Sequence, residues 1–186
     1  TQAVYVQLDV LEYNKRIDGQ VLDFKDFVNH PEAYVSDFER FTKVSDIYFA
    51  GHFHANNAPM ILTKEMLNAS DCKLKVVADI SCDVNGPIAC TIRSSTIEEP
   101  LYGYFPFEDK EVDFFHPAAV AVMAVDNLPC EIPRDASEGF GEQFMEHVIP
   151  AFFNGDKDGI LKRAKITENG KLTERFSYLQ DYVDGK

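Results

Sequence analysis

The chain has 186 residues, 45% of them hydrophobic, and it carries a formal net charge of -13 at pH 7. This length and composition predict one compact domain with a sizeable core, and the acidic balance argues against nucleic acid and against an anionic membrane surface as partners. No apolar run approaches the length of about 18 residues that a membrane span needs, and no signal peptide is visible at the amino end.

Three strands and two helices are expected in the first half of the chain. Pro31 is favoured at the first position of a helix, and this helix is expected to end near Val44. Thr63 can cap a short helix that runs through Leu67. The first helix should bury the side chains of Tyr34, Phe38 and Phe41. Apolar runs predict the strands, at residues 4–9, 46–51 and 75–81.

The second half opens with residues 88–117, which show no helical period and are expected to form a long excursion with at most short extended pieces. Residues 118–125 are eight apolar residues, which indicates a strand buried on both faces. Ser137 is then expected to cap a long helix that Pro150 kinks or ends. Further expected elements are a short helix that starts at Asp156 or Asp158, a hairpin at Asn169-Gly170 and a last amphipathic turn at residues 176–182.

Strands that alternate with helices predict an α/β fold, with a parallel sheet and helices on both faces. No G-x-G-x-x-G follows any expected strand. If the sheet binds a dinucleotide, its first, phosphate-binding strand-turn-helix must lie upstream of Thr1. Since the chain starts without methionine and enters an apolar segment at once, we expect it to be a fragment or a processed chain.

The carboxyl ends of the expected strands carry the candidate site, because ligands of open α/β sheets bind at that edge. Asp83 and Asp126 are placed to fix ribose hydroxyls or an amide, and backbone groups nearby can meet a flat ring. The alternative is that strand-end Asp and Asn side chains only cap turns. The candidate residues are Ile80, Ser81, Cys82, Asp83, Asp126, Asn127, Leu128 and Pro129.

Other chemistry-bearing residues give weaker signals. His52 and His54 share one face of an extended segment, but no third ligand stands at a telling spacing, so no metal site is expected. Residues 156–159 are similar to the start of a calcium loop, but Ile160 and Thr167 stand where oxygen ligands are needed. Arg93 is a candidate contact for a substrate carboxylate, with a surface arginine as the alternative.

The four cysteines lie far apart and form no C-x-x-C pair. We expect free buried thiols in a reducing cytoplasm, with disulfides or a zinc site as the alternatives. This expectation gives a cytoplasmic location.

Three segments resemble one family, the alanine dehydrogenase and lysine-forming saccharopine dehydrogenase superfamily, and most of all its lysine–2-oxoglutarate reductase branch. The segments are VVADISCD followed by Gly-Pro at residues 76–87, STIEEP at residues 95–100, and VDNLP with PRDAS and Phe-Gly at residues 125–141. The Ser-Thr-Ile-Glu-x-Pro segment favours the saccharopine branch over alanine dehydrogenase.

The resemblance implies two Rossmann-like domains with the active site in the cleft between them, and NAD or NADP as the cofactor. By this resemblance, residues 1–136 are the later part of the nicotinamide-dinucleotide-binding domain. Residues 137–186 are the return helix and a carboxyl-terminal segment that packs on the catalytic domain. The strand end at residues 80–83 and the loop at residues 126–129 would lie against the nicotinamide and its ribose.

The implied reaction joins lysine to 2-oxoglutarate and reduces the imine with hydride from the cofactor, which gives saccharopine. The implied partners are this small amino-acid substrate and the amino-terminal catalytic domain of the same protein. Whether the protein forms a homo-oligomer is left open. The family's acid/base pair has no match in this chain, so no catalytic residue is expected here and the fragment alone is expected to be inactive. The alternatives are an alanine dehydrogenase-type oxidoreductase and a non-catalytic binding module.

Overall fold

The computed structural model describes residues 2–55 and 57–186, which form two compact units divided between Glu131 and Ile132. The single compact domain expected from length is therefore not what forms. The physical reason lies in the second unit, where Ala151 is the one buried side chain among the described residues. A segment with so little buried surface adds almost nothing to a shared core.

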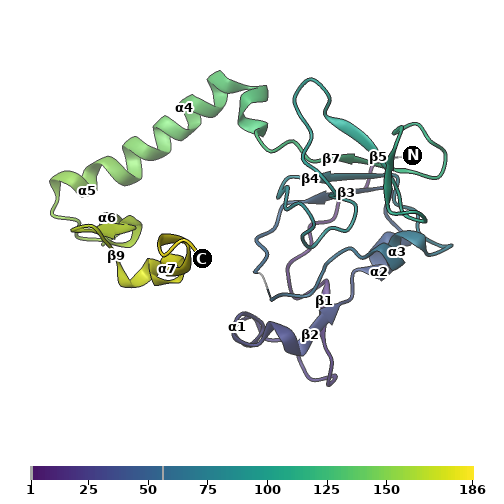
Figure 1. The fold of residues 1–186 in the computed structure, drawn as a ribbon, viewed down its shortest axis with the longest axis horizontal. Helices are drawn as coiled ribbons and strands as arrows, with labels where there is room; N and C mark the ends of the chain where they lie inside the picture. The colour runs from purple at the N-terminus through teal and green to yellow at the C-terminus, as the bar shows by residue number, and fades with distance from the viewer. Residues whose placement is uncertain (1, 56) are drawn as a thin grey trace. The chain divides into compact units, whose positions relative to one another are not determined.

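The first unit contains a five-stranded sheet in the order β3 (Ile47–Ala50), β4 (Val76–Asp79), β7 (Val120–Met123), β5 (Leu101–Phe105) and β6 (Lys110–Val112). The strands β3, β4 and β7 are parallel and lie side by side in Figure 1. These three strands confirm the strands that were predicted from the apolar runs of the sequence. The α/β class is confirmed as a mixed α/β fold.

The prediction of a parallel sheet is wrong for its outer half. β5 pairs antiparallel with β7 and with β6, so the excursion returns to the sheet as a hairpin. Tyr102 and Tyr104 lie on the same face of β5, and their exposed fractions are 2% and 0%. This burial explains why the segment is a strand, although Gly103 and the flanking Pro100 and Pro106 obscure the pattern in the sequence.

The core of this unit lies against the parallel strands. The completely buried aliphatic residues Leu62, Val77, Ile88 and Val122 belong to it, together with Tyr104. The expected cover of helices on both faces is not found at β3, where Ile47 and Phe49 are 52% and 65% exposed.

The short helix predicted after Thr63 is confirmed as α3 (Lys64–Asn68), and the Thr63 hydroxyl accepts a hydrogen bond from the Met66 amide at 3.3 Å. The helix predicted from Pro31 to Val44 is wrong. Its residues form a 3₁₀ turn (Pro31–Ala33), the strand β2 (Tyr34–Ser36) and the short helix α2 (Glu39–Thr42).

The neighbours of Tyr34 explain this difference. β2 pairs antiparallel with β1 (Asn14–Arg16), and the Tyr34 hydroxyl donates to the Asp26 carboxylate at 2.7 Å. Asp26 belongs to α1 (Phe24–Asn29), which Asp23 caps. These long-range contacts outweigh the local helix signal of Pro31. Tyr34 and Phe38 are nevertheless buried as expected, each 3% exposed.

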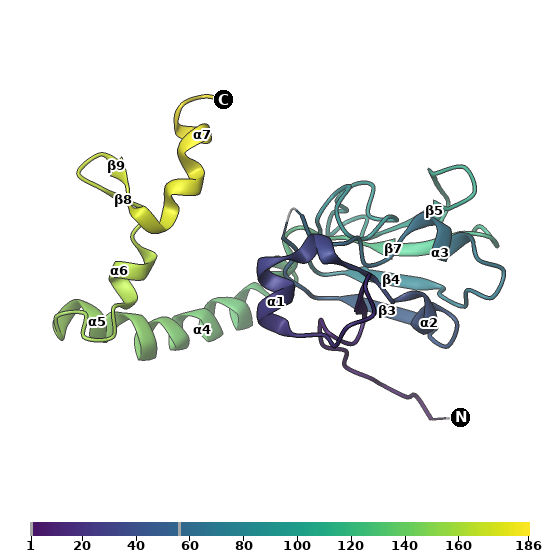
Figure 2. The ribbon, with the colours of Figure 1, turned by 90° about the horizontal axis from the view of Figure 1, so that it is seen from below.

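The strand predicted at residues 4–9 does not form. Val4, Tyr5 and Val6 are 88%, 79% and 67% exposed, and Figure 2 shows the purple amino-terminal segment running away from the sheet. No strand pairs with this segment among the described residues. An apolar run without a neighbour gains none of the hydrogen bonds or burial that stabilise a strand.

The second unit is built on a long helix in three parts: α4 (Pro133–Gln143), a π-helical turn (Phe144–Val148) and α5 (Ile149–Phe153). The helix begins at Pro133 and not after a cap at Ser137, because proline is preorganised for the first turn. Pro150 does not end this helix. Proline has no amide hydrogen to donate, and the π-helical turn just before Pro150 accommodates the missing hydrogen bond.

The remaining elements of this unit follow the sequence closely. The short helix predicted after Asp156 or Asp158 forms as α6 (Ile160–Ala164), which begins after Gly159, and the Asp156 carboxylate accepts hydrogen bonds from the amides of Leu161 and Lys162 at 3.0 and 2.9 Å. Asn169 and Gly170 both have positive φ and join β8 (Thr167–Glu168) to β9 (Lys171–Leu172). A 3₁₀ helix (Glu174–Leu179) and α7 (Gln180–Val183) complete the chain.

In residues 2–55 and 57–186, no helix is both long and apolar enough to cross a membrane.

Candidate functional site

The carboxyl ends of β3, β4 and β7 meet at one edge of the sheet. The register pairs Ala50 with Asp79 and Ala78 with Met123, so the segments that follow these strands start side by side. The Ile80 amide extends the pairing by donating to the Ala50 carbonyl at 2.8 Å. The structure therefore brings the two predicted segments, at residues 80–83 and 126–129, to the same edge.

Residues 80–83 turn sharply out of β4. Ile80 is 47% exposed at the edge, and the Ser81 hydroxyl donates to the Ala50 carbonyl at 3.2 Å. Cys82 has a φ of 51°, a left-handed conformation that costs a non-glycine residue about 1 kcal/mol. Its thiol donates to the Ala124 carbonyl at 3.0 Å, which links this turn to the end of β7.

The loop after β7 presents polar groups to solvent. Asp126, Asn127 and Pro129 are exposed, and Leu128 is half-buried at the start of a 3₁₀ helix (Leu128–Glu131). Within the described part of the chain, the side chains of Asp83, Asp126 and Asn127 make no hydrogen bond to protein atoms, so none of them caps a turn. Their oxygens are available to a ligand.

The carboxylates of Asp83 and Asp126 influence the ionisation of the Cys82 thiol. The pKa of its thiol is raised, first by burial and then by the negative charges of Asp79, Asp126 and Asp83. A thiol in these surroundings stays protonated at neutral pH, and it is not an activated nucleophile. The edge can therefore accept hydrogen bonds from a ligand, but it offers no reactive cysteine.

His52 follows β3 at the same end of the strands and contacts Ser81. Its Nδ1 is 3.3 Å from the Ser81 hydroxyl, and burial is the main cause that lowers the pKa of the imidazole. Its Nε2 is buried and has no hydrogen-bond partner among the described residues. His54 instead contacts the Pro59 carbonyl at 3.2 Å. In the described residues no group of three His, Cys, Asp or Glu side chains could hold a metal ion.

Arg93 has a carboxylate partner within the chain. Its guanidinium contacts both oxygens of Glu111, at 2.7 and 2.8 Å, and stacks over the Tyr102 ring at 4.5 Å. Glu111 therefore takes the position on the Arg93 guanidinium that was considered for a substrate carboxylate.

Asp79 and Thr91 are residues of the site that the sequence did not single out. Asp79 is the last residue of β4 and is completely buried, as is Thr91. Asp79 accepts hydrogen bonds from the Cys82 amide at 3.1 Å and from the Thr91 hydroxyl at 2.7 Å. The available signal was a charged residue at the end of an apolar run, since aspartate is seldom fully buried without a partner.

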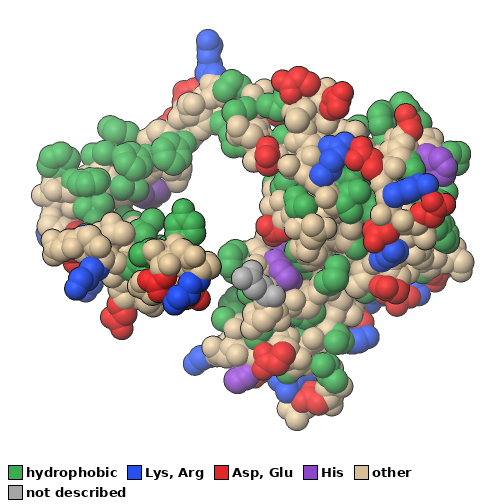
Figure 3. All heavy atoms as spheres, in the orientation of Figure 1, with side chains coloured by type: hydrophobic (Ala, Val, Ile, Leu, Met, Phe, Trp, Pro, Cys, Tyr) green, Lys and Arg blue, Asp and Glu red, His purple; other side chains and the backbone are tan. Residues whose placement is uncertain are grey.

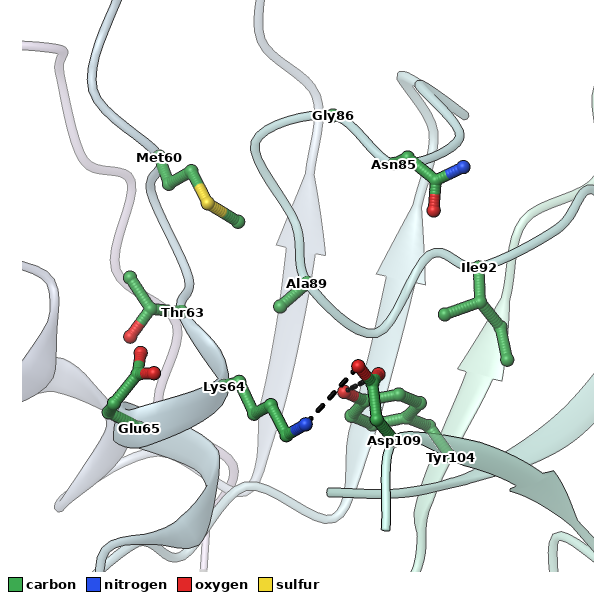
Figure 4. A pocket seen from close by; sticks show the side chains of 10 residues that line it. All are labelled: Met60, Thr63, Lys64, Glu65, Asn85, Gly86, Ala89, Ile92, Tyr104 and Asp109. Carbon is green, nitrogen blue, oxygen red and sulfur yellow. Dashed lines mark hydrogen bonds and ion pairs between the residues drawn. The ribbon is translucent and has the colours of Figure 1, made fainter. Parts of the chain in front are cut away.

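A hollow of about 340 Å³ lies elsewhere in this unit, and Figure 4 shows its lining. Lys64 reaches the Asp109 carboxylate at 3.2 Å, and the buried Tyr104 hydroxyl donates to the same carboxylate at 2.7 Å. Burial and the neighbouring carboxylate raise the pKa of Tyr104. None of the eight predicted site residues lines this hollow, and its Lys64 and Asp109 already pair with each other, so we take the strand edge as the candidate site.

All four cysteines are free thiols, as expected, but only Cys90 is fully buried and Cys130 is exposed. Burial is the main cause that raises the pKa of Cys90 to about 12. Because the thiolate is the reactive form, we expect iodoacetamide at mildly alkaline pH to label Cys130 in the folded protein while Cys90 stays unmodified. Mass spectrometry of the peptides would measure both rates. Denaturant should make the two rates similar, whereas equal rates in the folded protein would contradict the described burial.

No protein-family model matches the chain. Among curated proteins, it is 25% identical over 192 residues to an α-aminoadipic semialdehyde synthase of Rattus norvegicus, named mitochondrial, a match that covers 89% of this chain and 21% of that protein. It is 29% identical to the synthase of Arabidopsis thaliana, over 84% of this chain and 15% of that protein. A saccharopine dehydrogenase [NAD(+), L-lysine-forming] of Schizosaccharomyces pombe is 32% identical, over 67% of this chain and 33% of that protein.

The sheet and its polar strand ends define an α/β protein whose candidate ligand site lies at the carboxyl edge of parallel strands. The chain is related, at the level of the superfamily, to the saccharopine dehydrogenases and the α-aminoadipic semialdehyde synthases. It spans a third or less of the length of these relatives.

Proposed function

We propose that this chain is part of an NAD(P)-dependent oxidoreductase that interconverts saccharopine with lysine and 2-oxoglutarate, and that it supplies the wall of the active site facing the nicotinamide. The observation that carries the proposal is the shared edge of β4 and β7, after which follow the exposed side chains of Asp83 and Asp126, neither of which is hydrogen-bonded to a described residue. The name of the Schizosaccharomyces pombe relative, which includes NAD(+) and L-lysine, supports this choice of cofactor and substrate.

The residues at the edge fit a nicotinamide riboside. The Asp83 and Asp126 carboxylates, which have no hydrogen-bond partner among the described residues, can accept hydrogen bonds from ribose hydroxyls. The half-exposed Ile80 side chain and the backbone of Ser81 and Leu128 offer an apolar and polar surface to a flat ring. The cofactor would supply the hydride, and the role of these residues is to orient it and to keep water from the imine.

Other parts of the protein would complete the domain. β3 is an edge strand of the sheet and leaves Ile47 and Phe49 more than half exposed. We place the phosphate-binding strand-turn-helix, which this chain lacks, next to β3, where it would cover these side chains. Residues 1–136 would then be the later part of the dinucleotide-binding domain, as the sequence predicted.

The carboxyl-terminal segment offers a surface for the catalytic domain. Its large hydrophobic side chains are mostly exposed, and they crowd the surface of this unit in Figure 3. Among them are Phe140, Met145, Phe152, Phe153 and Tyr182, which are 61% to 85% exposed. An apolar surface of this kind marks an interaction site, so we propose that residues 137–186 pack on the amino-terminal catalytic domain of the same protein.

No residue of this chain is assigned the transfer of a proton, so the isolated chain should be inactive. The cytoplasmic location remains a prediction, since the relative from Rattus norvegicus is named mitochondrial.

Turnover by the full-length protein tests the proposal. We expect oxidation of NADH or NADPH that requires both lysine and 2-oxoglutarate. The alanine dehydrogenase-type alternative predicts turnover only with pyruvate and ammonia. The non-catalytic module predicts neither reaction and no binding of either cofactor. The isolated 186-residue chain is the control, and it should give no turnover with any of these substrates.

A further inference from the structure

Asp79 is a buried carboxylate at the end of β4. Its side chain is completely buried, and no Lys, Arg or His of the described residues forms an ion pair with it. Its two oxygens each accept one hydrogen bond, from the Cys82 amide and from the Thr91 hydroxyl. Because an apolar side chain would cost less to bury at this position, the stability of the core alone does not explain an aspartate here.

The hydrogen bonds of Asp79 fix the backbone of the loop that follows it. Cys82 has a φ of 51°, in a region of backbone conformation that residues other than glycine seldom adopt. The Cys82 amide donates a hydrogen bond of 3.1 Å to Asp79 Oδ1. Thr91 also connects Asp79 to the far limb of the loop, because the Thr91 carbonyl accepts a hydrogen bond from the Asn85 amide at 3.0 Å. The Asp79 carboxylate therefore contacts both limbs of the loop, one directly and one through Thr91.

Cys82 stands between the candidate site residues Ser81 and Asp83 in the loop after β4. Its thiol meets the Ala124 carbonyl at the end of β7, and the next residue is Asp83, whose carboxylate is exposed at the edge. We propose, on the basis of the function proposed above, that Asp79 is a positioning residue. It holds Cys82 in the left-handed conformation, so that Ile80 and Asp83 are preorganised to receive the nicotinamide riboside.

Paired substitutions at Cys82 separate this role from a general role in the core. Cys82→Gly and Cys82→Ala both remove the thiol, but only glycine adopts a positive φ without strain. Each is made in the full-length protein and again with Asp79→Ala, and the dissociation constants of NADH and NADPH are measured by calorimetry. Far-ultraviolet circular dichroism reports whether each variant folds.

With Asp79 present, the loop is already held, so the two Cys82 variants should bind the cofactor equally well. Asp79→Ala should raise the dissociation constant about tenfold, since the competent loop is then a minor conformation. Combining it with Cys82→Gly should restore most of this loss, and combining it with Cys82→Ala should restore none. Asp79→Asn should bind almost as the wild type does, because its amide can accept from Cys82 and donate to Thr91.

Equal binding by the glycine and alanine variants in the Asp79→Ala background would overturn the positioning role, while binding by the wild type would leave the proposed function standing. If the wild type binds neither cofactor, the proposed function fails. Hydrogen exchange at the Cys82 amide then decides the positioning role, and exchange unchanged by Asp79→Ala would refute it. If Asp79→Ala does not fold, Asp79→Ser takes its place, since its hydroxyl is too short to reach the Cys82 amide.

Discussion

Replacing Gly103 by alanine is expected to destabilise the first unit by about 3 kcal/mol, the upper end of the usual cost of overpacking. A Cβ atom at Gly103 would lie 2.5 Å from the Asp113 carbonyl oxygen and 2.9 Å from the Phe114 Cα. Both are backbone atoms, which cannot rotate away as a flexible side chain can. Gly103 also pairs with Val112 and Ala121, so relief of the clash must break pairing on one side of β5.

Urea unfolding followed by circular dichroism would measure this effect, and the midpoint should fall by about 1 M or more. The matched control is Gly139→Ala, because a Cβ at Gly139 in α4 meets no atom within 4 Å. Alanine favours a helix over glycine by about 1 kcal/mol, so this control should be neutral or stabilising. A Gly103→Ala variant as stable as the wild type would mean that β5 does not pass this close to residues 113 and 114.

Replacing Asp126 by alanine is expected to weaken cofactor binding by the full-length protein about 10- to 100-fold. The estimate corresponds to the loss of a hydrogen bond to a charged acceptor, which contributes about 1.5–3 kcal/mol. Stability should hardly change, because Asp126 is exposed and makes no hydrogen bond with described residues. Binding would be measured by titration with NADH and with NADPH.

The control for Asp126 is Glu32→Ala, which removes one exposed carboxylate far along the chain from both strand ends. It should leave the affinity unchanged, which separates a specific contact from the general loss of negative charge. An Asp126→Ala variant with wild-type affinity and wild-type stability would refute the placement of this residue against the cofactor.

The parallel strands were predictable because their residues are apolar, apart from Asp79 at the end of β4. Residues 75–81 were predicted as a strand and residues 118–125 as a buried strand, and β4 and β7 form within these ranges. The antiparallel half was not predictable in the same way, since proline and glycine interrupt the pattern of residues 100–106. What makes that segment a strand is the burial of Tyr102 and Tyr104, which depends on contacts distant in sequence.

Local signals were reliable where the local geometry decides the outcome. Thr63 caps α3, Asp156 begins the turn before α6, and Asn169-Gly170 forms the hairpin that its residue types favour. They failed at Pro31, because Tyr34 is drawn into a strand by its contacts with α1 and β1. A helix signal of about 1 kcal/mol does not outweigh such packing.

The candidate site shows the same division. Strand ends that carry Asp83 and Asp126 could be found from the alternation of strands and loops, and the structure places both segments at one edge. Asp79 could not be found in this way, because its importance comes from the left-handed turn at Cys82. A positive φ at a non-glycine residue leaves no mark in the sequence.

We propose above all that the carboxyl edge of β4 and β7 contacts the nicotinamide half of the cofactor. The most direct measurement is a crystal structure of the full-length protein with NADH or NADPH bound. We predict ribose hydroxyls within hydrogen-bond distance of the Asp83 and Asp126 carboxylates, with the nicotinamide ring against Ile80 and Leu128. A cofactor bound away from this edge, with neither carboxylate in contact, would contradict the claim.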